Sequence, residues 1–400
     1  MENVVVDEPP CSRTIALAEP LAGQNEGSPR LRVRLGSLVW SAVCGAASAA
    51  EWVFGLTSLL LGLATLAALP VIQVVTLGYF LESSARVART GRLRDGIIGV
   101  RPAARIGCLA AAIWLALIPA WLVGSYARAA QLIDPGGPGA RYWRIGQLVV
   151  TLISLLYIAI SCARGGRLRD FLWPWSHPFW LIRRLRAGGL YREIRDGVWE
   201  FVVSLRIPYY FRVGLVGFIG TLVWLAIPAT LIAATRRFPP LGLLGAILLA
   251  VIVPFVPFLQ VRFAVEGQIG ALFSRKAIRD RFRRAPWAFA FSLFVLLVAS
   301  IPLYFLKIEM IPREAAWLPS LVFVVFLAPA RLLTGWAYSR SGRRDTPRHW
   351  VFRLLGRVAI TAVALLYVLV VFMAQYTSWG GAGSLYEQHA FLLPVPFLNM

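Results

Sequence analysis

Long apolar stretches of about 20 residues, separated by arginine-rich joints, recur along this chain of 400 residues. A helix needs about that many apolar residues to cross the hydrocarbon core of a bilayer. Hydrophobic residues make up 58% of the sequence and charged residues only 15%, whereas a soluble domain has about 25% charged residues. The chain is therefore predicted to fold as an all-α, polytopic transmembrane helical bundle.

The apolar stretches predict eight transmembrane helices, paired into four hairpins. We expect these spans at 53–82, 106–126, 145–163, 213–235, 241–261, 287–306, 318–338 and 354–376. The preceding stretch, 37–50, is apolar but too short to cross a bilayer alone. It forms either an interfacial helix or part of a ninth span that reaches past Glu51. Eight and nine spans both remain open, and they place the N-terminus on opposite sides of the membrane.

Positive charge is concentrated on one side of the predicted helices. Four joints (83–105, 164–212, 262–286 and 339–353) carry 28 Lys and Arg, whereas the three loops opposite (127–144, 236–240 and 307–317) carry 7. Because cytoplasmic loops are enriched in Lys and Arg, the joints are predicted to be cytoplasmic and the C-terminus extracytoplasmic. The net charge of +22 is thus interpreted as an orientation signal, and nucleic acid is not an expected partner.

Two tails flank the predicted membrane domain, 37–376. Residues 1–36 mix charges of both signs with four prolines, which is typical of a disordered tail. Residues 377–400 contain no Lys or Arg and several aromatic side chains, which predicts an aromatic extracytoplasmic tail. The arginine-rich, lysine-poor composition favours a bacterial protein, and hence the bacterial cytoplasmic (inner) membrane.

Polar and ionisable residues within the apolar stretches are the candidate functional residues, because burying a charge in a membrane is costly. Gln260 and Arg331 each lie two or three residues after a proline of their own span, and proline interrupts helix hydrogen bonding. Arg262 and Glu266 are four residues apart and can pair on one helix face. We predict a polar site from these four residues, although the Arg262–Glu266 pair also fits a surface salt bridge beyond the membrane. Glu82 lies near a predicted span end and is expected to be hydrated.

The longest joint, 164–212, contains a segment that reads as an amphipathic helix lying on the membrane. After Gly188–Gly189, apolar residues recur at helical spacing, and charged residues fall mainly on the other face. Arginine near a membrane surface attracts anionic lipid headgroups. The predicted lipid contacts are Arg183, Arg184, Arg186, Arg192 and Arg195. An ordinary anchored loop is the alternative interpretation.

Catalytic and metal-binding motifs are not visible in the sequence. The four cysteines form no CxxC pair, and the three histidines lie in joints or tails. No HExxH, GxSxG or Walker motif occurs. We therefore expect no enzymatic activity, no metal site and no cofactor.

One stretch resembles a family of uncharacterised prokaryotic multi-pass membrane proteins. It runs from Leu69-Pro70 through Gly78-Tyr79 to Arg86 and Arg89-Thr90-Gly91, within a partial match over about residues 53–126. The resemblance implies membrane location and no particular chemistry. The sequence then leaves two functions: a permease-like or transport-associated protein, and a non-transporting scaffold that contacts anionic lipids.

Overall fold

The computed structural model describes residues 30–69, 71–164, 180, 182–183, 186, 188–305, 317–377 and 385. Within these residues every regular element is a helix, which confirms the all-α prediction. The long helices are α1 (Arg30–Ala68), α2 (Gln73–Thr90), α3 (Val100–Ile133), α4 (Pro138–Ala163), α7 (Leu190–Ser204), α8 (Ile207–Ala233), α9 (Pro239–Ile252), α10 (Val256–Glu266), α11 (Arg275–Arg284), α12 (Pro286–Phe305), α13 (Trp317–Gly342) and α14 (Trp350–Thr377). Short 3₁₀ helices are η1 (Leu93–Gly96), η3 (Ala234–Arg236) and η4 (Ile269–Phe273).

Seven helical segments of the described chain are long and apolar enough to cross a membrane, and the bent pair α9–α10 adds an eighth. The seven are the Ser48–Ala68 part of α1, then α3, α4, the α7–α8 segment from Ile194 to Ala233, α12, α13 and α14. The bend between α9 and α10 is 43°. Seven of these segments correspond to predicted spans, and the segment of α1 covers only the first part of the predicted span 53–82. The chain is therefore a multi-pass integral membrane protein.

The prediction of one continuous span over 53–82 is wrong, because the chain reverses direction between α1 and α2. The hydroxyl of Thr76 in α2 donates to the carbonyl oxygen of Leu63 in α1 over 3.3 Å. In a continuous helix, these residues would be about 20 Å apart. Val71 lies in the break with a φ of 69°, a conformation unusual for a β-branched residue. The stretch therefore forms a helical hairpin.

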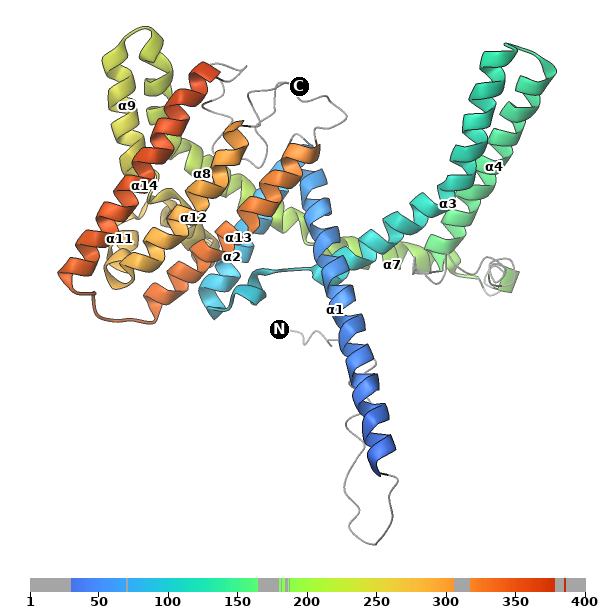
Figure 1. Ribbon diagram of the computed structural model, residues 1–400, viewed down its shortest axis with the longest axis horizontal. Helices are drawn as coiled ribbons and strands as arrows, with labels where there is room; N and C mark the ends of the chain where they lie inside the picture. The colour runs from blue at the N-terminus through green and yellow to red at the C-terminus, as the bar shows by residue number, and fades with distance from the viewer. Residues whose placement is uncertain are drawn as a thin grey trace.

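Helix α2 lies at the centre of the main helical body, with α8 and α13 packed beside it (Figure 1). Fourteen of its 18 residues are buried, from Gln73 to Val87. The α3–α4 hairpin stands apart from this body and joins it through α1 (Figure 1). Much of the hairpin surface is apolar and exposed, as a lipid-facing surface would be. The polar residues of α2, among them Thr76, Glu82 and Ser84, are therefore enclosed by protein.

Helices α2 and α8 cross in direct backbone contact. A Cβ on Gly78 would collide with the carbonyl oxygen of Tyr210, and a Cβ on Gly214 would collide with the carbonyl oxygen of Val74. Small residues at helix crossings let membrane helices approach closely. On its other side, α2 is joined to α13, because the Ser84 hydroxyl donates to the carbonyl oxygen of Arg331 over 2.9 Å. Both contacts hold α2 against the helices that carry the candidate site.

Helix α1 begins at Arg30, so the last seven residues of the predicted tail 1–36 are helical. Residues 1–29 lie outside the described part of the chain, as do residues 378–384 and 386–400 of the predicted aromatic tail. Four prolines are accommodated within helices. Pro119, Pro228, Pro302 and Pro329 all lie inside continuous helices.

Candidate functional site

Gln260 and Arg331, two of the predicted site residues, are in direct contact in the interior of the bundle. Both are fully buried, and Arg331 is among the largest fully buried side chains of the described chain. The Nη1 group of Arg331 on α13 donates to Oε1 of Gln260 on α10 over 2.6 Å. The two residues are 71 positions apart in the sequence. The structure thus brings together two candidates from different spans.

A third residue, Thr221 on α8, continues this contact. The Nε2 group of Gln260 donates to the Thr221 hydroxyl over 2.6 Å, and that hydroxyl donates to the carbonyl oxygen of Gly217 over 2.8 Å. Thr221 is itself buried. A directed chain of hydrogen bonds therefore runs from the Arg331 guanidinium through a neutral amide to the backbone of α8. We call Thr221, Gln260 and Arg331 the interior polar chain.

Gln260 follows the bend between two helices, and Arg331 follows a proline inside a continuous helix. Gln260 lies in the first half of α10, after the bend that separates α10 from α9. Arg331 follows Pro329 inside α13. Proline removes one helix hydrogen bond and clashes with the preceding turn, so neighbouring backbone groups need other partners. A polar cluster beside a helix bend and a helix proline is similar to the binding sites of transporters, where helices are interrupted near the membrane midplane.

Arg262 and Glu266 do not join the interior polar chain. Their side chains pair with each other over 2.7 Å at i,i+4, with exposures of 20% and 34%. Glu266 is the last residue of α10, followed directly by Gly267 in a left-handed conformation. The pair therefore occupies a partly exposed helix end, which agrees with the surface salt bridge that the sequence also allowed.

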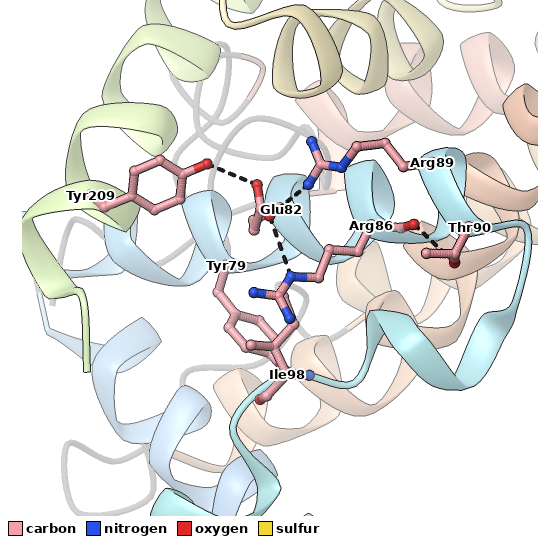
Figure 2. A network of polar contacts seen from close by, with 7 residues as sticks. All are labelled: Tyr79, Glu82, Arg86, Arg89, Thr90, Ile98 and Tyr209. Carbon is pink, nitrogen blue, oxygen red and sulfur yellow. Dashed lines mark hydrogen bonds and ion pairs between the residues drawn. The ribbon is translucent and has the colours of Figure 1, made fainter. Parts of the chain in front are cut away.

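A second polar cluster, centred on Glu82, was missed at the level of sequence. Glu82 was expected to be hydrated, but its side chain is only 8% exposed. Its Oε1 accepts from Nη2 of Arg89 over 2.8 Å and from Nε of Arg86 over 3.4 Å, both on α2 (Figure 2). Its Oε2 accepts from the hydroxyl of Tyr209 on α8 over 2.8 Å. Burial is tolerated because both carboxylate oxygens have hydrogen-bond donors. We call Glu82, Arg86, Arg89 and Tyr209 the Glu82 cluster.

Beside this cluster, the Tyr79 side chain binds the segment that connects α2 to α3 (Figure 2). The Tyr79 hydroxyl donates to the carbonyl oxygen of Ile98 over 3.0 Å and accepts from the Ile98 amide over 3.1 Å. The Tyr79 and Tyr210 rings lie 5.9 Å apart. The start of α8, the end of α2 and the link to α3 therefore meet at one junction.

The predicted lipid-contact arginines lie on the surface where the structure describes them. Arg183, Arg186, Arg192 and Arg195 are exposed. Arg184 lies outside the described residues. Arg195 pairs with Asp196 over 2.8 Å. Glu51, which the possible ninth span would include, is exposed on α1.

The spacing around Glu82 was the only sequence signal for its cluster. Glu82, Arg86 and Arg89 follow at i, i+4 and i+7, which places them on one helix face. The partner on α8, Tyr209, is 127 residues away, and no local pattern indicates it. For the same reason Thr221 was absent from the predicted site.

Comparisons with known proteins find no protein similar to this chain. No family model, no curated protein and no solved structure matches the chain.

Proposed function

We propose that this multi-pass membrane protein is a permease-like or transport-associated protein, and that the interior polar chain is the part that meets its solute. The observation that carries the proposal is the fully buried guanidinium of Arg331, held on a neutral amide between α8, α10 and α13. A charge in the membrane interior is costly, and such residues usually mark solute pathways. A cationic group flanked by an amide and a hydroxyl favours small anions as solutes.

We infer that the arginine-rich joints face the cytoplasm, with the bacterial inner membrane as the location. The four-to-one excess of Lys and Arg in the joints supports this orientation.

Replacing Arg331 with Gln should strongly reduce anion movement through the protein. In proteoliposomes, we expect the efflux of labelled phosphate, acetate or chloride to fall about tenfold in Arg331→Gln, since the positive charge that would stabilise the passing anion is lost. The matched control is Arg340→Gln, the same change at an exposed position in the last turn of α13. Equal efflux from the Arg331 variant and the wild type would contradict the proposal, as would wild-type vesicles that release none of the three anions.

A second candidate function, a scaffold that contacts anionic lipids, is favoured by α7. This helix exposes Val198, Trp199 and Val202 together with Arg192 and Arg195. In Figure 1, α7 runs across the direction of α12, α13 and α14, as a helix lying on a membrane surface would.

The lipid-scaffold function predicts that α7 responds to lipid charge. A fluorophore attached at residue 199 of the full chain in nanodiscs should shift to the blue when phosphatidylcholine is replaced by phosphatidylglycerol. The shift should shrink as salt rises, because salt screens surface charges, and it should be weaker in Arg192→Gln/Arg195→Gln. An emission wavelength that changes with neither lipid charge nor salt would exclude this role for α7.

A further inference from the structure

Two arginines of the Glu82 cluster present most of their hydrogen-bond donors outward. The side chains of Arg86 and Arg89 are 40% and 43% exposed, whereas the Glu82 carboxylate that holds them is 8% exposed. Each guanidinium carries five N–H donors, and Glu82 accepts one from each arginine. In the described part of the chain, neither guanidinium donates to any other protein group. The remaining donors are therefore available to a ligand.

The charge at this junction is unbalanced. Arg206, at the start of α8, is exposed, and both Arg206 and Arg86 interact electrostatically with the hydroxyl of Tyr210. Two guanidinium groups thus bind one carboxylate, and a third arginine acts on the hydroxyl of Tyr210, the residue next to Tyr209. The arginine fork matches the oxygens of a phosphate, which can accept several N–H groups at once. The cluster has the charge and the donors of a phosphate site.

The position of the cluster beside the end of α7 points to a membrane lipid as the source of the phosphate. Arg206 lies directly between α7 and α8, and it adopts a left-handed conformation with a φ of 50° that turns the chain from one helix into the other. Helix α7 exposes Trp199 and other apolar side chains beside charged ones, as helices at the headgroup level do. A phosphate held where α7 ends and α8 enters the bundle is therefore at the level of lipid headgroups.

We propose that Arg86, Arg89 and Arg206 bind the phosphate of one anionic membrane lipid, with Glu82 and Tyr209 as positioning residues. Glu82 fixes the two guanidinium groups of α2 side by side, and Tyr209 ties that carboxylate to α8. The site joins α2 to the end of the surface helix α7. It is independent of solute transport, and it differs from the diffuse attraction of α7 because it binds lipid with defined stoichiometry.

The experiment counts lipids that stay bound when the full chain is released from nanodiscs containing phosphatidylglycerol and phosphatidylcholine, by native mass spectrometry. We expect the wild type to retain one phosphatidylglycerol, and Arg86→Gln/Arg89→Gln to retain about tenfold less, since both arginine forks are lost. The matched control is Arg92→Gln/Arg94→Gln, which removes the same charge from exposed positions of the same joint. Equal losses in both double variants, or no lipid retained by the wild type, would overturn the site.

Two further variants and one added ligand test the same site. Arg86→Lys/Arg89→Lys keeps the positive charge but removes the planar set of N–H donors of the guanidinium. This variant should fold like the wild type and still lose most of the retained lipid. Glu82→Gln should retain less lipid than the wild type although no phosphate-binding group is removed, and unchanged retention would remove Glu82 from the site. Inorganic phosphate, added to the wild type in phosphatidylcholine nanodiscs, should not raise Tm as phosphatidylglycerol does. An equal rise would show a free-phosphate site and overturn the lipid assignment.

Discussion

Gln260→Leu is expected to destabilise the protein by about 2 to 3 kcal/mol, because it removes the acceptor from a buried charged donor. Nη1 of Arg331 would lose the Gln260 oxygen, and the Thr221 hydroxyl would lose the amide that donates to it. The desolvation of both groups remains, while the two hydrogen bonds that Gln260 makes to them are gone. Thermal denaturation in detergent, followed by size-exclusion chromatography, would measure the loss as a lower Tm.

The double variant Gln260→Leu/Arg331→Met should recover much of that loss. Replacing both partners by apolar groups of similar shape removes the unsatisfied charge together with its acceptor, which is often nearly neutral for stability. The control is Gln268→Leu, the same change at an exposed position beyond the end of α10. If the double variant were less stable than Gln260→Leu alone, the contact between Gln260 and Arg331 would not be the source of the effect. The double variant should still show strongly reduced anion movement, since Arg331 is absent.

The spans were predictable because their signal is local. A run of about 20 apolar residues crosses a membrane whatever surrounds it, and arginines mark its ends. The cap of α2 was predictable on similar grounds, because Gly91 takes the left-handed conformation expected at a helix C-terminus. The reversal at 69–72 was not, since no charged residue interrupts Leu69–Ile72 to separate α1 from α2.

The contacts between helices could not be predicted from the sequence, because they depend on how each helix is rotated in the bundle. Arg331 was recognisable as a candidate from its position in an apolar run. Its hydrogen bond with Gln260, however, depends on the packing of α10 against α13. For Glu82, the prediction of a hydrated side chain was wrong. Its charge near the end of a run favoured hydration, yet Tyr209 and two arginines satisfy it in the interior. A carboxylate with enough hydrogen-bond donors can be buried, and only the fold shows whether those donors lie within reach of it.

Gly78→Ala should destabilise the protein, whereas the same change at Gly62 should not. The new Cβ at Gly78 would press on the carbonyl oxygen and carbon of Tyr210, which are backbone atoms of α8 and cannot swing aside as a side chain can. Overpacking of this kind costs about 1–3 kcal/mol. At Gly62, on the exposed side of α1, a Cβ meets nothing within 4 Å. Alanine is the better helix former there, by up to about 1 kcal/mol.

The comparison of Gly78→Ala with Gly62→Ala therefore isolates the α2–α8 crossing, because helix propensity favours alanine in both variants and only the crossing opposes it. The measurement is Tm of both variants in the same detergent, together with lipid retention in nanodiscs. Since Tyr209 directly precedes the backbone that Gly78 contacts, separating α2 from α8 should also weaken the bond from Tyr209 to Glu82, and lipid retention should fall with Tm. A Gly78→Ala variant as stable as Gly62→Ala would mean that α2 and α8 do not cross in backbone contact, and both the Glu82 cluster and the lipid site would lose the helix packing on which they depend.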